Sequence, residues 1–449
     1  MHRIFKAYDV RGVVPDELDE RVAEAVGAAF VEVTRASSLV VAHDMRASSR
    51  PLADAFARGA TARGADVIDA GLGSTDLLYY ASGSLGLAGV MFTASHNPAR
   101  YNGMKMCRPG AVPIGGDTGL TEIRDRAAEL LRSGVDGERT GSVIRKDLLQ
   151  GYAGHLRSLV DLSGIRPLKV VVDAGNGMAG LTVPVVFDGL PVTLIPLYFE
   201  LDGTFPNHEA NPLEPANLVD LREAVVREGA DIGLAYDGDA DRCWVVDERG
   251  ESVSPSSITA LVAVRELARA PGATIIHNLI TSKSVPEIVA EHGGVPVRTR
   301  VGHSFIKAEM ARTGAVFGGE HSAHYYFKDF WFADSGMLAA LHVLAALGGQ
   351  DRPLSELLSG YTRYVASGEI NSRVEDQAAA LRRVREAYAG REGVAFDELD
   401  GLTVTGPGWW FNLRPSNTEP LLRLNAEADD ERLMVAVRDE VLAVVRGEL

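Results

Sequence analysis

Residues 87–98 read LAGVMFTASHNP, an apolar run that ends in a polar loop. The apolar part is typical of a buried strand, and Asn97-Pro98 does not allow regular structure to continue simply. Ser95 is therefore expected on an exposed turn, beside His96 and near the ammonium group of Lys105. A hydroxyl presented in this way is a candidate nucleophile or phosphate carrier. The alternative is an ordinary turn in which Ser and Asn hydrogen-bond their own backbone.

Two other stretches have the same form. Residues 230–242 read ADIGLAYDGDADR, and residues 314–324 read GAVFGGEHSAH. Each has a small-residue entry, a short apolar strand and a polar loop, which indicates three related units. In open parallel sheets, ligands bind beyond the carboxyl ends of the strands. We therefore expect the three loops to face one cleft.

Helical and strand patterns alternate around these stretches, which predicts largely parallel, three-layered α/β sheets with a first boundary near residue 150. After Tyr361 the pattern changes to an α+β unit. Helices are expected at about 15–33, 50–63, 76–82, 118–133, 148–160, 255–269, 376–389 and from 431. Strands are expected at about 39–42, 65–69, 87–92, 168–173, 231–236, 273–277, 295–298, 314–317, 402–404, 410–413 and 421–425.

Length and composition limit the class of protein. The 449 residues allow about three domains, each with its own core. The net charge of −16 argues against non-specific nucleic-acid binding, so an anionic substrate needs locally placed Lys and Arg. No run resembles a signal peptide or a membrane span, and we expect a cytoplasmic protein without a membrane partner. The two cysteines, Cys107 and Cys243, exclude a disulfide framework and a cysteine metal cage.

Asp237, Asp239 and Asp241 alternate directly after an apolar strand. In an extended loop their carboxylates would point to one side and repel one another unless a cation lay between them. Oxygen ligands favour a hard divalent ion, Mg²⁺ before Ca²⁺ or Mn²⁺. The spacing also resembles the start of an EF-hand loop, but Arg242 stands where that loop requires Gly, and residues 243–246 read as a strand. A solvated acidic turn is the remaining alternative.

Residues 414–420 read RPSNTEP and lie between two expected strands of the last unit. A guanidinium, two hydroxyls, an amide and backbone N–H groups in one loop suit a phosphate-binding nest. Pro, Ser and Asn are also common in ordinary turns, so the loop by itself leaves both interpretations open.

Polar residues of the third unit are candidates for binding a sugar. Glu320, Ser322 and His324 have groups that can hydrogen-bond sugar hydroxyls, although such residues in loops are often only solvated. His303 and Lys307 have helical i, i+4 spacing and can share one face, with Lys307 expected at the surface. The chain has no GxxxxGK[ST] loop, which argues against ATP as a phosphate donor.

The motifs TASHNP, DGDADR, GEHSAH and RPSNTEP, in this order and each in its own unit, resemble the α-D-phosphohexomutase superfamily, in its phosphomannomutase/phosphoglucomutase branch. The resemblance covers essentially the whole chain. It implies an α/β fold of three related α/β domains with mixed, mostly parallel sheets, plus a C-terminal α+β (TATA-box-binding-protein-like) domain, in a heart shape. The implied domains are 1–150 with the phosphoserine loop, 151–253 with the metal-binding loop, 254–362 with the sugar-binding loop and 363–449 with the phosphate-binding loop.

The resemblance also implies a role for each motif residue. Ser95 is the phosphoserine, and Ser95, Asp237, Asp239 and Asp241 hold Mg²⁺. Arg242 lies beside the transferring phosphoryl group, and Lys105 and His303 act as proton carriers or electrostatic stabilisers. The implied substrate-binding residues are Tyr8, Arg11, His96, Lys283, Glu320, Ser322, His324, Arg414, Ser416, Asn417 and Thr418.

The implied reaction interconverts mannose 6-phosphate and mannose 1-phosphate through phosphoserine and a hexose 1,6-bisphosphate, which also serves as the priming activator. Asn417 and the aromatic pair Tyr325-Tyr326 favour this branch, and glucose phosphates are expected as further substrates because glucose differs from mannose only at C2. Preference for glucose or glucosamine phosphates is one alternative; a non-catalytic sugar-phosphate sensor and a phosphatase are others. The protein is expected to be a monomer or weak dimer that binds no nucleic acid.

Overall fold

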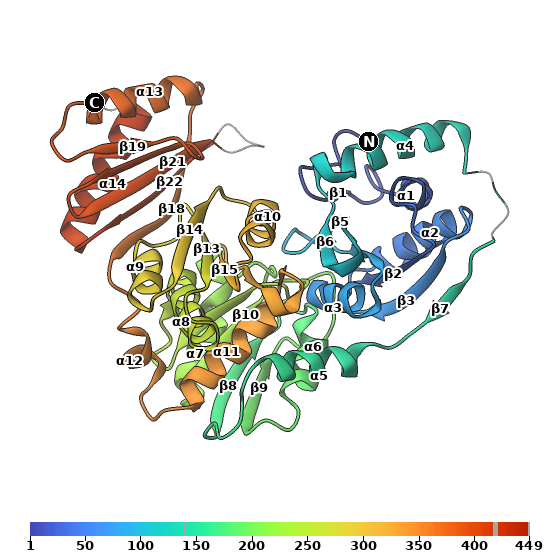
Figure 1. Ribbon diagram of the computed structural model, residues 1–449, viewed down its shortest axis with the longest axis horizontal. Helices are drawn as coiled ribbons and strands as arrows, with labels where there is room; N and C mark the ends of the chain where they lie inside the picture. Colours follow the sequence, from blue (N-terminus) through green and yellow to red (C-terminus); the bar gives the residue numbers. More distant parts are fainter. Residues whose placement is uncertain (136, 138–139, 416–420, 448–449) are drawn as a thin grey trace. The chain divides into compact units, whose positions relative to one another are not determined.

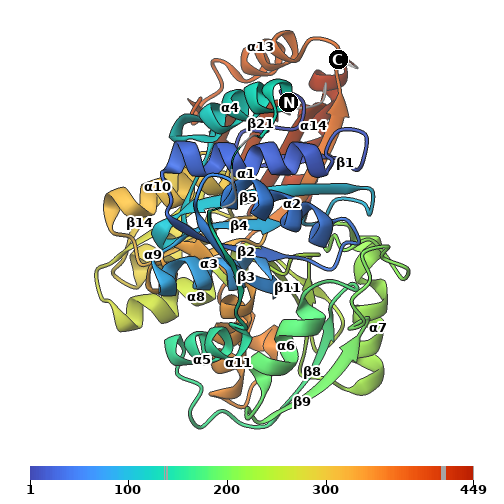
Figure 2. The ribbon, with the colours of Figure 1, turned by 90° about the vertical axis from the view of Figure 1, so that its right-hand side faces the viewer.

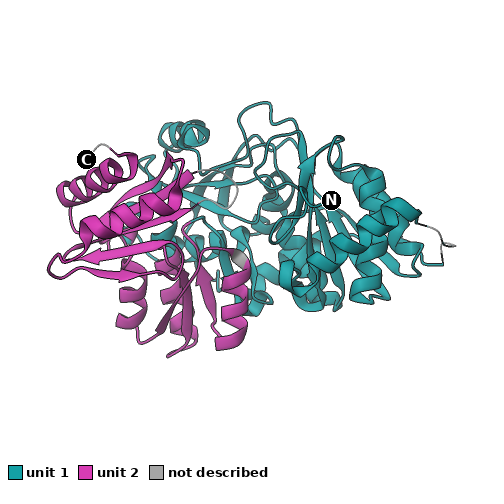
Figure 3. Cartoon of the chain, turned by 90° about the horizontal axis from the view of Figure 1, so that it is seen from above, with its two compact units in different colours: residues 1–258, 322–357 teal, residues 259–321, 358–449 magenta. Residues whose placement is uncertain are grey.

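The structure, a computed structural model, describes residues 1–135, 137, 140–415 and 421–447, without the side chain of His303. It forms two compact units, shown in different colours in Figure 3. Unit 1 comprises Met1–Ile258 and Ser322–Leu357, and unit 2 comprises Thr259–His321 and Leu358–Leu449. None of the described helices combines the length and the apolar composition needed to cross a membrane.

Unit 1 begins with a seven-stranded mixed sheet in the order β1-β5-β4-β2-β3-β7, with β6 paired to β5 (Figure 1). Its strands are β1 (Val10–Val13), β2 (Ser38–His43), β3 (Asp66–Leu72), β4 (Ala88–Phe92), β5 (Tyr101–Arg108), β6 (Val112–Pro113) and β7 (Val143–Arg145). Its helices are α1 (Glu20–Thr34), α2 (Ser49–Thr61), α3 (Thr75–Leu85) and α4 (Leu120–Ser133). β2, β3, β4 and β7 are parallel, whereas β1, β5 and β6 pair in antiparallel fashion.

The alternation of side chains along β2 explains why this sheet has helices on both faces. Leu39 and Val41 belong to one core with residues of α1, α2 and α4, while Val40 and Ala42 belong to a second core with residues of α3. Successive side chains of a strand point to opposite faces, so an uninterrupted apolar strand requires cover on both sides. The helices α1 and α2 lie side by side (Figure 2), and a Cβ at Gly27 of α1 would collide with the carbonyl of Phe56.

A second sheet of unit 1 has the order β12-β11-β10-β8-β9. Its strands are β8 (Leu168–Asp173), β9 (Val192–Leu197), β10 (Ile232–Tyr236), β11 (Cys243–Asp247) and β12 (Ser252–Val253). β8, β9 and β10 are parallel, and β10 continues into β11 as an antiparallel hairpin. The helices of this part are α5 (Leu149–Leu159), α6 (Ala179–Phe187) and α7 (Val219–Glu228). β16 (Tyr325–Phe327), β17 (Ala333–Asp334) and α11 (Gly336–Gly348) complete the unit, and α12 (Leu354–Leu358) ends it.

Unit 2 contains three parallel strands, β13 (Thr274–Asn278), β14 (Val295–Thr299) and β15 (Phe317–Gly319), with α9 (Ser284–Glu291) and α10 (His303–Thr313). α8 (Pro255–Arg269) leads into this unit. A five-stranded antiparallel sheet follows, in the order β18-β22-β21-β20-β19. Its strands are β18 (Val365–Arg373), β19 (Ala395–Asp397), β20 (Leu402–Gly406), β21 (Trp409–Pro415) and β22 (Leu421–Ala428), and α13 (Gln377–Tyr388) and α14 (Glu431–Arg446) share a core with it. This is the expected α+β part of the chain.

Three local expectations were wrong. The first helix begins at Glu20 rather than near residue 15, because the side chain of Asp19 caps it by accepting a hydrogen bond from Val22 N at 2.8 Å. Residues 101–108, for which no strand was predicted, form β5 along β4. Val143–Arg145, which is also absent from the predicted strands, forms the edge strand β7. β5 also pairs with the distant β1, and β7 pairs with β3; local sequence patterns do not reveal such pairings.

Candidate active site

The loop after β4 carries Ser95 in a strained conformation. Ser95 has φ +51°, in the left-handed region that non-glycine residues seldom adopt, and it is buried. Its backbone N–H donates to Thr93 Oγ1 at 2.9 Å, and its Oγ lies 3.0 Å from Asp237 Oδ2 and 3.2 Å from His96 Nδ1. A serine hydroxyl has one hydrogen to donate, so it bonds one of these acceptors at a time. Ser95 is thus buried among polar groups, whereas the sequence predicted that it would lie on an exposed turn.

The aspartate loop joins β10 to β11 and forms a tight turn, not the extended segment expected from the sequence. Ala240 has φ +57° at the turn. The carboxylates nevertheless converge, since one oxygen from each of Asp237, Asp239 and Asp241 lies within 4.8 Å of the others. A Cβ on Gly238 would stand 2.5 Å from the carbonyl oxygen of Ser95. Only glycine therefore permits the two loops to approach this closely.

Lys105 reaches the aspartate loop from β5. Because β5 runs antiparallel to β4, Lys105 lies opposite Met91, one residue before the end of β4. Its Nζ donates to Asp239 Oδ2 at 2.6 Å and to Asp241 Oδ2 at 2.5 Å. Burial alone would lower the pKa of Lys105, but the two carboxylates raise it above its ordinary value, so the side chain is an ammonium.

The three aspartates differ in their environment. Burial would raise the pKa of Asp239, but the charge and hydrogen bond of Lys105 hold it below its usual value. Burial and then the negative charge of Asp239 raise the pKa of Asp241. Asp237 accepts from Arg242 Nε at 2.8 Å, and Arg242 lies with its guanidinium 5.0 Å from the ring of Trp244. Three carboxylates thus face two cations, Lys105 and Arg242, and the raised pKa of Asp241 reflects burial together with this unbalanced negative charge.

Two carboxylate oxygens of this loop provide a test of whether a cation fits. Asp239 Oδ1 and Asp241 Oδ1 are buried and accept no hydrogen bond from the described residues. Buried carboxylate oxygens are costly without a partner, and three converging carboxylates offer the all-oxygen donor set of a hard divalent ion. The residues present thus fit a magnesium ion, and the acidic cluster can bind a metal.

His96 completes the immediate surroundings of Ser95. Arg242 Nη2 donates to His96 Nδ1 at 2.5 Å, so Nδ1 is an acceptor and the proton of the neutral ring is on Nε2. Burial, followed by the positive charges of Arg242 and Arg11, lowers the pKa of His96 well below its ordinary value. Arg11 in turn donates to Asn97 Oδ1 at 2.5 Å and to Asp9 at 2.6 Å. Tyr8 lies half-buried in the segment before β1.

His324 lies within the same unit as this cluster. Its Nε2 is 3.9 Å from Asp241 Oδ1 and 3.9 Å from Asp334 Oδ2, and its Nδ1 is 3.2 Å from Ser322 Oγ. Asp334, which ends β17, was not among the predicted site residues. Thr75 was not among them either; its Oγ1 donates to Asp239 Oδ2 at 2.5 Å and its N–H donates to Asp239 O at 3.0 Å. The helix-start pattern Ser74-Thr75-Asp76 was the only local signal for Thr75.

The remaining candidate residues belong to unit 2. Glu320 follows β15 and is buried. Arg414, near the end of β21, is also buried; burial lowers the pKa of its guanidinium, although Glu369, at 3.3 Å from Nη2, opposes this. Arg414 Nη1 is buried and has no hydrogen-bond partner among the described residues. A buried, unsatisfied N–H of a guanidinium suits an anionic ligand.

Lys283, predicted to bind substrate, contacts other residues of unit 2. It caps α9, its N–H donates to Glu427 Oε1 at 2.9 Å, and its Nζ stands 5.5 Å from the ring of Tyr364. It lines a pocket of about 200 Å³ together with Trp410 and Arg298. His303 begins α10, but its side chain lies outside the described part of the structure, as do Ser416, Asn417 and Thr418. Lys307, expected at the surface, is 4 % exposed.

The chain belongs to the phosphoglucomutase/phosphomannomutase family: it matches alpha/beta/alpha domain I over residues 2–132, domain II over 150–250, domain III over 254–364 and the C-terminal domain over 369–444. These four matches confirm the four-domain α/β architecture implied by the resemblance and correct the estimate of about three domains from length alone.

Relatives align along the whole chain. A phosphomannomutase of Escherichia coli strain K12 is 40% identical over 451 residues, covering 99% of both chains. A Xanthomonas campestris protein named phosphohexose mutases is 42% identical over 446 residues, again covering 99% of both. The crystal structure of a phosphoglucomutase/phosphomannomutase family protein from Burkholderia thailandensis has a TM-score of 0.89 and 34% identity, covering 99% of this chain and 98% of that one. The kinship therefore extends over every domain.

Proposed function

We propose that the protein is a phosphomannomutase that interconverts mannose 6-phosphate and mannose 1-phosphate and also accepts glucose phosphates. The observation that carries the proposal is the placement of Ser95 Oγ 3.0 Å from Asp237, inside a buried cluster that also holds Lys105 and Arg242. Phosphoryl transfer needs positioning and charge neutralisation more than covalent chemistry from the protein, and these groups supply both. The names of the relatives favour mannose phosphates.

In this proposal Asp237, Asp239 and Asp241 would hold Mg²⁺, with Ser95 as the fourth residue of the metal site. The two buried carboxylate oxygens without donors among the described residues support this assignment. A bound magnesium ion would supply additional positive charge to a phosphoryl group on Ser95. Lys105 and Arg242 are cations held in fixed positions by the same carboxylates, so they neutralise charge without reorganisation.

The proposed reaction conserves all groups. A hydroxyl of the hexose monophosphate attacks the phosphorus of phospho-Ser95, and the new P–O bond to the sugar forms as the P–O bond to Ser95 Oγ breaks. The hydroxyl proton leaves to a base, for which we propose His303. The released Ser95 Oγ takes up a proton and becomes a hydroxyl again, with Lys105 proposed as the proton carrier on this side. The resulting hexose 1,6-bisphosphate turns around and returns its other phosphoryl group to Ser95. A hexose 1,6-bisphosphate added from outside primes the unphosphorylated protein by the second half of this sequence.

Substrate binding is assigned to the other motif residues. We propose that Glu320 and Ser322 hold sugar hydroxyls, with His324 beside them, and that Arg414, Ser416, Asn417 and Thr418 hold the non-reacting phosphate. The buried, unpaired N–H of Arg414 supports this role. Tyr8, Arg11, His96 and Lys283 are proposed to complete the substrate site. Among these, Arg11 and His96 are the best supported, since both lie in the hydrogen-bond network of the Ser95 loop.

Several properties remain predictions from the sequence. They are a domain division at 1–150, 151–253, 254–362 and 363–449, a cytoplasmic location, a monomeric or weakly dimeric state and the absence of a nucleic-acid partner. A phosphatase has no need for a second phosphate-binding loop, and a sensor has no need for an intact Ser95 and metal loop. The relative turnover of mannose, glucose and glucosamine phosphates distinguishes the proposed preference from the other two.

The test compares mutase turnover of mannose 1-phosphate, glucose 1-phosphate and glucosamine 1-phosphate, with Mg²⁺ and a priming hexose 1,6-bisphosphate, for the wild type and Ser95→Ala. We expect turnover of the first two and near-complete loss in Ser95→Ala, because the phosphate carrier is gone. Preference for glucosamine 1-phosphate would change the substrate but keep the mechanism. Release of free phosphate alone, or activity that does not depend on Ser95, would reject the proposal.

A further inference from the structure

Arg46, which no sequence motif singled out, lies beneath the Ser95 loop. It follows β2 and is 2 % exposed. Its Nη1 donates to the carbonyls of Pro98 at 2.9 Å and Tyr101 at 3.0 Å, and its Nη2 donates to the carbonyls of Ser95 at 2.9 Å and Asn97 at 2.6 Å. Four backbone carbonyls within one seven-residue stretch thus accept from a single guanidinium.

The donors of this guanidinium are fully used. An arginine side chain has five N–H groups, and the fifth, on Nε, donates to Asp44 Oδ2 at 3.2 Å. Asp44 is itself fixed, because its Oδ1 accepts from Arg46 N at 3.0 Å and from Ser49 Oγ at 2.5 Å. The ring of Phe205 lies 5.0 Å from the guanidinium carbon. Arg46 is therefore held rigidly by its own neighbours while it binds the loop.

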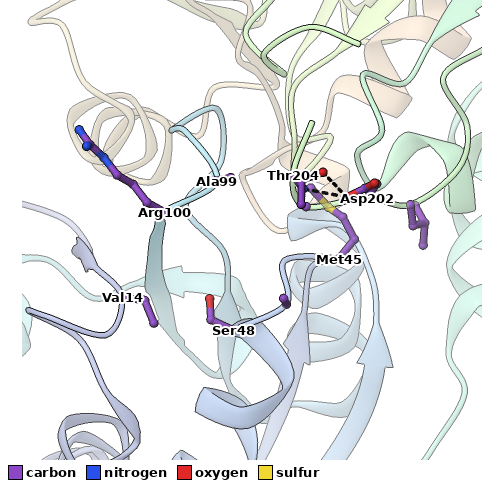
Figure 4. A pocket seen from close by; sticks show the side chains of 10 residues that line it. Val14, Met45, Ser48, Ala99, Arg100, Asp202 and Thr204 are labelled. Carbon is purple, nitrogen blue, oxygen red and sulfur yellow. Dashed lines mark hydrogen bonds between the residues drawn. The ribbon is translucent and has the colours of Figure 1, made fainter. Parts of the chain in front are cut away.

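The loop needs such support for two reasons. Ser95 has a left-handed φ of +51°, a conformation that persists only where the surroundings enforce it. The loop also borders open space: Ala99 and Arg100 line a pocket of about 350 Å³ that Met45, Ser48, Asp202 and Thr204 line from other segments (Figure 4). A loop released from Arg46 would have room to relax.

We infer that Arg46 is the positioning residue that sets the place of Ser95 Oγ for phosphoryl transfer, by fixing the four carbonyls of its loop. The inference rests on the proposed role of Ser95 as phosphate carrier. Arg46 acts through the backbone, so it contributes to the chemical step and not to the binding of the sugar. Lysine cannot replace it, because an ammonium has three donors and lacks the planar fork that serves two pairs of carbonyls.

The variants Arg46→Gln and Arg46→Lys test this inference, with Arg157→Gln as the matched control. Arg157 Nη1 also donates to three backbone carbonyls, those of Val185, Val186 and Asp188, but it does so at the end of α6 and away from the Ser95 loop. All three changes therefore remove guanidinium-to-carbonyl bonds from unit 1. Only the changes at Arg46 alter the loop that carries Ser95.

For Arg46→Gln we expect kcat to fall about a hundredfold, the loss associated with a misplacement of about 1 Å, with little change in the KM of the hexose phosphate. Arg46→Lys is expected to lose nearly as much, and Arg157→Gln to retain the wild-type kcat. Hydrogen exchange of residues 93–103 should become faster in both Arg46 variants and remain unchanged in Arg157→Gln. If Arg46→Gln does not fold, Arg46→Lys carries the same comparison.

Wild-type kcat in either folded Arg46 variant, or a loss of kcat that Arg157→Gln shares in proportion to its thermal destabilisation, would overturn the inference. A wild-type protein without mutase activity would instead reject the proposed function. Exchange of residues 93–103 would still report whether Arg46 holds the loop, so the two failures are distinguishable.

Discussion

The variant Gly238→Ala tests whether the close approach of the Ser95 loop and the aspartate loop is required for activity. The added Cβ would stand 2.5 Å from Ser95 O, where ordinary van der Waals contact begins at 3.4 Å, and the opposing atom belongs to the backbone. The two loops would therefore have to separate by about 1 Å, a displacement that can cost a hundredfold in rate. Overpacking of this kind usually destabilises by about 1–3 kcal/mol.

The expected result is a fall of about a hundredfold in kcat, with little change in the KM of the hexose phosphate, because the methyl group separates Ser95 from the carboxylates of the aspartate loop and leaves the proposed sugar-binding residues alone. Steady-state mutase assays at saturating bisphosphate measure it, and thermal unfolding measures the stability change. Gly154→Ala is the control, because its Cβ would meet nothing within 4 Å in α5 and should be neutral or slightly stabilising. A Gly238→Ala protein with wild-type kcat would refute the reasoning that the spacing of these loops is essential.

Two further predictions concern groups around the site and away from it. Thr75→Val should lower the affinity for Mg²⁺ several-fold and the free energy of unfolding by about 1.5–3 kcal/mol, because Asp239 loses a charge-assisted hydrogen bond. A titration with Mg²⁺ measures the affinity. An unchanged affinity would show that Thr75 has no positioning role. Burial lowers the pKa of His208, but its bond to Asp173 at 2.9 Å outweighs this and raises the pKa above the ordinary value. The pair therefore stabilises the protein fully below about pH 6.5 and progressively less as pH rises through the folded-state pKa. The difference in thermal midpoint between wild type and His208→Gln should accordingly shrink from acidic to alkaline pH, and a difference independent of pH would contradict the assigned pair.

Much of the fold and of the candidate site could be predicted from local sequence. Residues 87–98 and 230–242 each combine a strand run with a loop of unusual polar residues, and the structure brings Ser95 and Asp237 into hydrogen-bond distance as those motifs indicated. The resemblance assigned each motif to its own domain, and the family matches agree with that order. Motifs are readable because their chemistry needs particular residue types at fixed short spacings.

The tertiary structure decides which residues outside the motifs contact the motif residues. Arg46 and Thr75 are ordinary residues of a strand exit and a helix start, and their contacts with the Ser95 loop and Asp239 depend on strand order rather than on neighbouring sequence. Lys307 is buried although its sequence context resembled a surface helix. Gly238 is required because a distant carbonyl approaches it. Sequence determines which groups each segment carries, whereas burial, pKa and hydrogen-bond partners arise only when segments far apart in the chain are packed against one another.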